Sequence, residues 1–199
     1  NLILCFNGEI YNYKELSNFL IQKGYQIETS SDTEIIIKLF HLENIKSFKK
    51  LSGIFSISIY DKIEKKLYLV RDLIGVKNLY YLHQSQKLYF SSLIEPLKKV
   101  LINKELNQNA CNNYFNFNRN DGDETFFKNI FQLKPGELLI FADKIIEKKQ
   151  LLDYDFNNNT NIKDKDIRAK IEKIVKNQFI SDVPVALSLS GGVDSNLLR

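Results

Sequence analysis

The sequence predicts an α+β domain followed by the beginning of a second unit of the α/β class. Three observations support this prediction. Between Leu51 and Gln150 short β-prone segments alternate with turns, which is typical of antiparallel hairpins. Two earlier segments have helical patterns instead, and a late apolar run leads into a glycine-rich loop, as a buried strand of a parallel sheet would.

The start of the chain predicts two short strands. Residues 2–6, LILCF, are apolar and β-prone, and the Asn-Gly pair at 7–8 predicts that a turn follows them. The segment YQIETS at 25–30 predicts the second strand.

Two helices alternate with these strands. The first is expected over 13–23, with Asn12 as its N-cap and Gly24 ending it. The second is expected over 31–42, and its first residues, Ser-Asp, supply the cap.

The middle of the chain predicts antiparallel pairs. The segment IFSISIYD at 54–61 alternates strictly, which indicates a half-buried strand, and LYLVRD at 67–72 returns beside it. A second hairpin is expected from 78–84 and 87–92 through the pair Ser-Gln. Helices over 93–101 and 110–116, and a final strand pair over 133–141 and 143–150, complete this part.

The overall composition limits the class of protein. The 199 residues are 44% hydrophobic, enough for a real core, and contain no apolar run of the roughly 18 residues that a membrane span needs. Lysines are interleaved with glutamates, so we read the net charge of +4 as a solvated surface and expect no nucleic-acid or membrane partner. Two cysteines form no disulfide framework, which favours the cytoplasm.

The polar, low-complexity stretch DFNNNTN at 155–161 predicts a domain boundary, with domains at 1–155 and 162–199. The second domain would begin with a helix over 166–179 and a buried strand over 183–190. Because the chain contains no Met and opens on Asn followed by a strand, we expect it to be an internal fragment of a longer protein.

The loop SGGVDS after the last predicted strand indicates a phosphate site. Gly191 and Gly192 let an anion approach the backbone amides, and the hydroxyls of Ser190 and Ser195 add donors. Asp194 is the exception, because a carboxylate repels phosphate unless a metal or a helix start compensates. The loop lacks the Gly-Lys-Ser/Thr ending of a P-loop, and an ordinary glycine-rich turn is the alternative.

The segment FNGEIYNY at 6–13 indicates a second site. The side-chain amide of Asn7 and the backbone N–H of Gly8 would form an oxyanion hole for acyl transfer. The carboxylates of Glu9 and Asp32 would bind a ligand ammonium group. An ordinary Asn-Gly turn and an N-cap aspartate remain the alternatives.

Six motifs in order carry a family resemblance: FNGEIYNYKEL, SDTE, LSGIFSISIYD, RDLIGVKNLYY, LKPGE and SDVPVALSLSGGVDS. Together they resemble the glutamine-dependent asparagine synthetase family. The resemblance implies a class II glutamine amidotransferase domain with the four-layer αββα sandwich of N-terminal-nucleophile hydrolases. The start of an α/β PP-loop ATP pyrophosphatase domain would follow. Asn78 departs from the pattern, since the family usually has proline there.

The family's chemistry then assigns roles to these residues. Asn7 and Gly8 would form the oxyanion hole, and together with Glu9 and Asp32 they would bind glutamine. ATP with Mg²⁺ would activate a carboxylate, typically that of aspartate, for attack by ammonia that arrives through an internal tunnel. No side chain is predicted to ligate a metal directly. The residues implied to contact ATP are Ser188, Leu189, Ser190, Gly191, Gly192, Asp194 and Ser195.

The family's nucleophile, a cysteine at the mature N-terminus, has no counterpart here, so this fragment itself is expected to be inactive. Cys5 is expected to be a buried strand residue, Cys111 has no motif partner, and His41 and His83 are expected to be structural. Two alternatives remain open: the same chemistry on another acceptor, such as a surface-polysaccharide sugar carboxylate, or a non-catalytic glutamine-binding domain. A homodimer is a further expectation.

Overall fold

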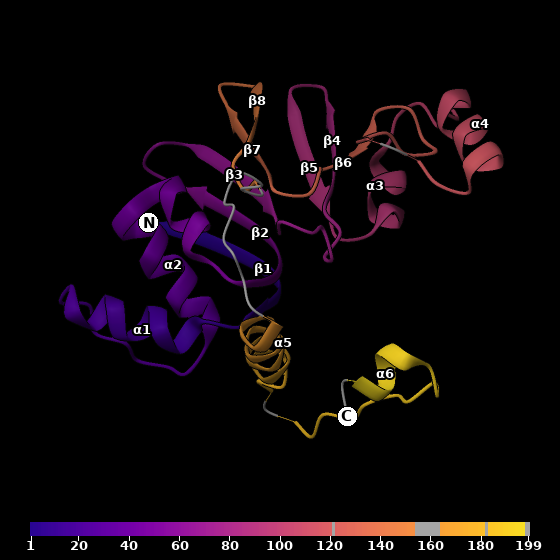
Figure 1. The fold of residues 1–199 in the computed structure, drawn as a ribbon. Coiled ribbons are helices and arrows are strands. Elements are labelled where there is room, and N and C mark those ends of the chain that lie inside the picture. Colours follow the sequence, from indigo (N-terminus) through magenta and orange to yellow (C-terminus); the bar gives the residue numbers. More distant parts are fainter. Residues whose placement is uncertain (121, 154–163, 182, 198–199) are drawn as a thin grey trace. The chain divides into compact units, whose positions relative to one another are not determined.

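The computed structural model of the chain describes residues 1–120, 122–153, 164–181 and 183–197. The chain divides into two compact units, Asn1–Tyr154 and Asp155–Arg199. The first unit combines helices with antiparallel sheets, which confirms the α+β class (Figure 1). The domain limits 1–155 and 162–199 stay predictions, and each unit is described by itself.

The first unit contains eight described strands and four α-helices. The strands are β1 (Leu2–Ile10), β2 (Gly53–Asp61), β3 (Lys66–Arg71), β4 (Tyr80–Gln84), β5 (Lys87–Ser91), β6 (Ile130–Gln132), β7 (Glu137–Ala142) and β8 (Ile145–Gln150). The helices are α1 (Tyr13–Gln22), α2 (Asp32–Glu43), α3 (Ile94–Val100) and α4 (Gln108–Phe117), with a 3₁₀ helix η1 at Asn44–Lys50.

The strands form two sheets. The larger has the order β1-β2-β3-β7-β8 and the smaller the order β5-β4-β6, with antiparallel neighbours throughout. The predicted hairpins are confirmed: β4 pairs with β5 through Ser85 and Gln86, and β7 pairs with β8 through Asp143 and Lys144. All four turn residues have positive φ, as two-residue hairpin turns require.

Side chains on alternate strand positions face different layers. Ile57 of β2 packs against α1 and α2, while Leu69 of β3 joins Tyr81 of β4 in a cluster between the two sheets. On the far side of β4, Leu82 packs against Leu97 of α3. The unit is therefore built as helices, sheet, sheet and helix, which confirms the four-layer arrangement (Figure 1).

The Asn-Gly pair at 7–8 is not a turn, so that prediction is wrong. β1 continues to Ile10, and Gly8 pairs with Phe55 of β2. A Cβ on Gly8, at φ +152°, would lie 2.0 Å from the carbonyl oxygen of Ile54. The glycine therefore serves a close approach of two strands and not a reversal of the chain.

The prediction that β2 is half-buried is also wrong. Its small polar positions are as covered as its apolar ones: Ser56 and Ser58 are 4% and 5% exposed. The second sheet covers the face on which they lie. The sequence alternation instead separates a helix-facing side from a side that faces the second sheet.

Two local predictions near the N-terminus fail for a common reason. Residues 25–30 form no strand, and the side chain of Asn12 does not cap α1. In both cases a side chain binds backbone groups of another segment. The amide of Asn12 donates to Lys50 O at 2.9 Å and accepts from Ser52 N at 2.9 Å. The carboxylate of Glu34 accepts from the backbone of the 25–30 segment. Helix α1 and the stop at Gly24, φ +87°, are confirmed.

The connection from β3 to β4 joins the two sheets, and two buried charges hold it. The carboxylate of Asp72, 1% exposed, accepts hydrogen bonds from the backbone N–H groups of residues 55, 74, 75, 76 and 77. Arg71, 6% exposed, donates to the carbonyls of residues 75, 77 and 133 and to the amide oxygen of Asn78. Asn78, the departure from the family pattern, is thus a member of this network.

The second unit contains α5 (Asp164–Gln178), which agrees with the helix predicted over 166–179, and α6 (Val193–Leu197). The predicted buried strand at 183–190 is wrong in this structure, because these residues form no strand and are exposed. An apolar segment of this kind needs strands on both sides, and none of the described residues of this unit pairs with it.

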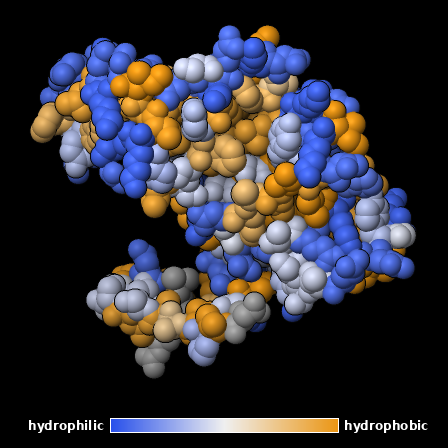
Figure 2. Space-filling model, turned by 180° about the vertical axis from the view of Figure 1, so that it is seen from behind, coloured by the Kyte–Doolittle hydropathy of each residue, from blue (hydrophilic) through white to orange (hydrophobic). Residues whose placement is uncertain are grey.

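The surface of the first unit mixes hydrophobic and hydrophilic side chains (Figure 2). Helix α4 buries only Ala110 and leaves Phe115 and Phe117 exposed at 85% and 68%.

In the part of the chain that the structure describes, no helix combines the length and apolar character needed to cross a membrane.

Candidate functional site

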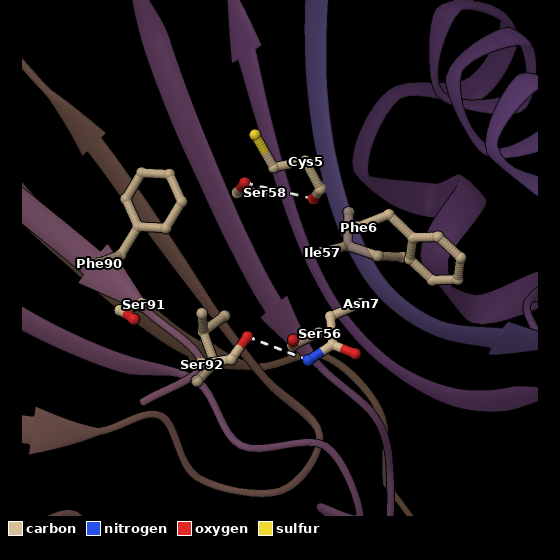
Figure 3. Close-up of a pocket in the computed structure, with 10 residues that line it drawn as sticks. Cys5, Phe6, Asn7, Ser56, Ile57, Ser58, Phe90, Ser91 and Ser92 are labelled. Atoms are coloured by element: carbon tan, nitrogen blue, oxygen red, sulfur yellow. Dashed lines mark hydrogen bonds between the residues drawn. The ribbon is translucent and has the colours of Figure 1, made fainter. Parts of the chain in front are cut away.

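A pocket of about 180 Å³ opens between the two sheets at the β1–β2 edge (Figure 3). Hydroxyls and apolar groups share its wall. The lining residues are Cys5, Phe6, Asn7, Ser56, Ile57, Ser58, Leu79, Phe90, Ser91 and Ser92. Of the residues predicted from sequence to bind glutamine, Asn7 is the one that lines this pocket.

The floor of the pocket consists of two cross-strand pairs from β1 and β2. Asn7 pairs with Ser56, and Cys5 pairs with Ser58, so the four side chains lie on one face of the sheet. The amide nitrogen Nδ2 of Asn7 donates to the hydroxyl of Ser92 at 3.1 Å. This bond ties the larger sheet to the end of β5 and points the amide into the pocket (Figure 3).

The expectation that Cys5 is buried is wrong. It lies within β1 as predicted, but it is exposed and not buried, because β1 is the edge strand of the larger sheet. Its backbone carbonyl accepts a hydrogen bond from the Ser58 hydroxyl at 3.3 Å. Cys111 is a free, partly buried cysteine.

The other predicted glutamine-binding residues lie along the same strand and at its end. Gly8 and Glu9 follow Asn7 on β1. Asp32 opens α2, and its carboxylate accepts a hydrogen bond from the backbone N–H of Ile10 at 3.1 Å. Ser31, not Asp32, caps the helix, since its side chain accepts from the N–H of Thr33.

The end of β1 has a negative electrostatic environment. Burial raises the pKa of the Tyr11 phenol, and the carboxylates of Glu9 and Asp72 raise the pKa further. Together with Asp32 at Ile10, this environment would favour a cationic ligand group. The prediction that Glu9 and Asp32 bind an ammonium is consistent with these charges and stays a prediction.

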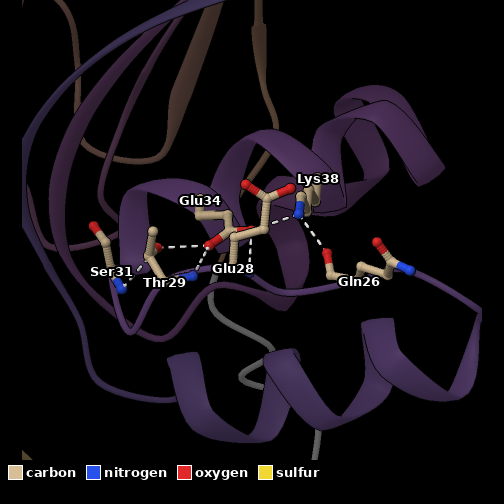
Figure 4. Close-up of polar contacts among 6 residues, drawn as sticks. All are labelled: Gln26, Glu28, Thr29, Ser31, Glu34 and Lys38. Carbon is tan, nitrogen blue, oxygen red and sulfur yellow. Dashed lines mark hydrogen bonds and ion pairs between the residues drawn. The ribbon is translucent and has the colours of Figure 1, made fainter.

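The loop before α2 positions Asp32, and Glu34 organises that loop (Figure 4). Its carboxylate accepts from the backbone N–H groups of Glu28 and Thr29 at 2.9 and 2.7 Å and from the Thr29 hydroxyl at 2.5 Å. Lys38, one helical turn later, donates to Glu34 and to the carbonyl of Gln26. Bonds from Lys38, Thr29 and the loop backbone lower the pKa of Glu34 to about 2.

This network predicts a specific acid response. Because the pKa of Glu34 is lower in the folded protein than its usual value near 4.3, its stabilising effect is full above about pH 5. We expect the effect to be lost as the pH falls from there toward 2. The difference in unfolding temperature between wild type and Glu34→Gln should therefore be largest at neutral pH and shrink at acidic pH.

The matched control is Glu15→Gln, which changes an exposed glutamate in the first turn of α1 and touches none of these groups. A difference between wild type and Glu34→Gln that stayed constant from pH 7 to pH 2 would contradict the role given to this carboxylate.

In the second unit, the predicted phosphate loop is exposed and held by its own hydroxyls. The Ser190 and Ser195 hydroxyls lie 3.1 Å apart, and Ser195 donates to the carbonyl of Gly192 at 3.0 Å. Gly191 has φ +80°, and a Cβ built on it would have no atom within 4 Å. Ser188 and Leu189 precede the loop, and Asp194 lies in the first turn of α6.

Both histidines make contacts with aromatic side chains. His41 shares a 2.8 Å hydrogen bond with the Tyr25 hydroxyl, and the ring of His83 packs against Phe141. Both contacts agree with structural roles. Within residues 1–120, 122–153, 164–181 and 183–197, no three His, Cys, Asp or Glu side chains gather so that they could hold a metal ion.

Sequence reasoning missed the hydroxyl side of the pocket. Ser56 and Ser58 alternate with isoleucines in IFSISIY, and this pattern predicts a half-buried strand. The missed signal is that both polar positions carry small hydroxyl residues, whereas a solvated strand face commonly carries charged ones. Ser91 and Ser92 gave no local signal, because their place opposite β1 depends on how the sheets stack.

Known proteins similar to this chain cover both units. A family model described as "Glutamine amidotransferase domain" matches residues 1–152, and one described as "Asparagine synthase" matches residues 166–198. The glutamine-hydrolyzing asparagine synthetase 1 of Bacillus subtilis is 33% identical over 98% of this chain and 32% of that protein. Asparagine synthetase 2 of the same organism is 32% identical over 98% of this chain and 28% of that protein. The chain thus spans about a third of the length of such relatives.

A solved structure supports the fold independently. Glutamine phosphoribosylpyrophosphate amidotransferase of B. subtilis superimposes with a TM-score of 0.55 at 20% identity, covering 75% of this chain and 29% of that one. At this identity the likeness concerns the fold alone.

Proposed function

Because this chain belongs to the glutamine amidotransferase domain family, we propose that its first unit binds glutamine and stabilises the transition state of its hydrolysis to glutamate and ammonia. The second unit would belong to an ATP-dependent domain that uses this ammonia. For the whole protein we propose the synthesis of asparagine from aspartate, ATP and glutamine, which the names of its relatives favour.

One observation carries the proposal: the amide of Asn7 points into a pocket between the sheets, and Ser92 holds it there. One N–H of Nδ2 is used by Ser92, and the second remains for a substrate oxygen. Next to it, Gly8 brings its backbone into close approach with β2. A rigid donor at this place suits the charge that develops on a carbonyl oxygen during acyl transfer.

The proposed reaction follows from this donor. A thiolate adds to the carboxamide carbon of glutamine, and the carbonyl electrons move to the oxygen that Asn7 and Gly8 face. The C–N bond then breaks, the nitrogen takes a proton, and ammonia leaves. Water next releases glutamate from the thioester and restores the thiol. By family resemblance the thiol belongs to an N-terminal cysteine of the mature protein, and the exposed Cys5 is not assigned this role.

In the second unit, the proposed ligand is the pyrophosphate portion of ATP. The exposed hydroxyls of Ser190 and Ser195 and the open backbone at Gly191 fit an anion. Gly192 and Asp194 complete the loop, and Ser188 and Leu189 would border the nucleotide. ATP, when bound, would activate the carboxylate of the acceptor for attack by ammonia. Since Asp194 is a single carboxylate, Mg²⁺ would bind mainly through phosphate oxygens.

Asp32→Asn in the full-length protein tests the proposed binding of glutamine. Asparagine keeps an oxygen for the N–H of Ile10 but loses the charge that would face the glutamine ammonium. We expect KM for glutamine to rise about 10- to 100-fold, as loss of a charge-assisted hydrogen bond implies, while ammonia-dependent synthesis is retained.

The control for this experiment is Asp143→Asn at the exposed turn between β7 and β8, where φ is +49° and asparagine is well tolerated. Equal losses of glutamine-dependent and ammonia-dependent synthesis in Asp32→Asn would show that Asp32 serves only the fold.

A further inference from the structure

Ser56 is an unusual residue of the pocket. It is 4% exposed and lies on the central part of β2, directly opposite Asn7. Among the residues that the structure describes, none makes a hydrogen bond to its hydroxyl. Ser56 lines the pocket, so the little of it that is exposed lies at the pocket wall and its hydroxyl is open to a ligand there. A ligand that fills the pocket and excludes water would have to supply a hydrogen-bond partner for this hydroxyl.

Ser58 provides an internal comparison. It occupies the same face of the same strand, is equally buried at 5% exposure, and also lines the pocket. Its hydroxyl, however, donates to the carbonyl of Cys5 at 3.3 Å. Of the two serine hydroxyls on β2, only that of Ser56 is therefore left without a partner among the described residues (Figure 3).

Asn7 and Ser56 together offer one hydrogen-bond donor and one acceptor, which is what recognition of a primary carboxamide requires. A cross-strand pair places the Cβ atoms of its two residues roughly 5 Å apart, so both side chains can reach one small group between them. Asn7 offers an N–H donor to the oxygen. Ser56 offers a hydroxyl oxygen that accepts from the NH₂ group.

We propose that Ser56 is a specificity-determining residue that accepts a hydrogen bond from the amide nitrogen of the substrate side chain. Ser56 thereby favours a carboxamide over an ester. The inference rests on the proposed function, because it places the glutamine side chain between Asn7 and Ser56. An ester has no N–H from which Ser56 could accept, and its alkoxy oxygen is a poor acceptor for the Ser56 hydroxyl.

The experiment compares two acyl donors in the full-length protein: L-glutamine, and the γ-methyl ester of L-glutamate. Both are attacked at the same carbon and give the same acyl group, and they differ in the leaving group, ammonia or methanol. We expect Ser56→Ala to lower kcat/KM for glutamine about 10-fold relative to the ester, because one hydrogen bond to the NH₂ group is lost. Ser58→Ala should leave the ratio of the two substrates unchanged.

The unfolding temperature of each variant accompanies the kinetics. Since the Ser56 hydroxyl has no described partner, Ser56→Ala should not unfold at a lower temperature than wild type. Ser56→Cys, which keeps the size and a weak acceptor, should fall between wild type and Ser56→Ala in its preference for glutamine.

The outcomes separate this inference from the proposed function. A selective loss of glutamine hydrolysis in Ser56→Ala supports it. Equal losses with both substrates would show that Ser56 only shapes the pocket, and would overturn the inference while glutamine hydrolysis by wild type still supports the proposed function. If wild type hydrolyses neither substrate, both proposals are wrong.

Discussion

Asp72→Ala is expected to lower the free energy of unfolding by about 4 kcal/mol, the largest effect on stability that we predict for any single side chain of this protein. The variant leaves five backbone N–H groups, those of residues 55, 74, 75, 76 and 77, without the carboxylate that accepts their hydrogen bonds. Asp72 is 1% exposed, so water cannot replace the carboxylate without opening the turn.

The loss should extend beyond the turn itself. Arg71 is buried beside Asp72, and burial lowers the pKa of its guanidinium, whereas the Asp72 charge opposes that shift. Removing Asp72 leaves a buried cation whose remaining partners are carbonyls and the amide of Asn78. Since the turn leads from β3 to β4, we expect the contact between the two sheets, and with it the pocket, to loosen.

The matched control is Asp61→Ala. Asp61 also accepts hydrogen bonds from backbone N–H groups, those of Ile63 at 2.8 Å and Glu64 at 3.2 Å, but it lies in a partly exposed hairpin turn. Water can replace it there, so we expect a loss of about 1 kcal/mol or less. Urea unfolding followed by circular dichroism measures both variants, and equal losses would contradict the role given to Asp72.

The parts of the fold that the sequence predicted are those with local causes. The hairpin of β4 and β5 could be predicted because alternation marks both strands and only Ser85 and Gln86 separate them. The strand β6 could not, because its three residues, Ile130–Gln132, form a strand only by pairing with β4, some fifty residues earlier. Sheet order is a property of distant pairings, which no local pattern contains.

The candidate site likewise combines residues that a local motif predicts with residues that only the fold brings to the pocket. Asn7 was found because an Asn-Gly pair in that motif has recognisable chemistry, although the turn predicted from it was wrong. Ser92, which holds its amide, is 85 residues away in the chain, and no local signal connects the two. The strand predicted over 25–30 is wrong for a related reason, since the carboxylate of Glu34 and not a neighbouring strand binds the backbone of this segment.

The second large effect concerns catalysis: Asn7→Ala in the full-length protein is expected to lower kcat for glutamine hydrolysis about 100- to 1,000-fold. The amide N–H that faces the pocket would no longer stabilise the oxyanion, and alanine offers no other donor. Synthesis from free ammonia should be retained, because it does not use this pocket. A coupled assay for glutamate and for asparagine measures both rates in one preparation.

Asn112→Ala, on the exposed side of α4, is the matched control and should leave both rates unchanged. The distribution of the Asn7→Ala loss between kcat and KM decides what Asn7 does. A donor that acts on the developing oxyanion contributes more to the transition state than to the bound substrate, so the loss should fall mainly on kcat. A rise in KM alone would mean that Asn7 only binds glutamine. Equal losses with glutamine and ammonia would mean that its bond to Ser92 serves to hold the two sheets together.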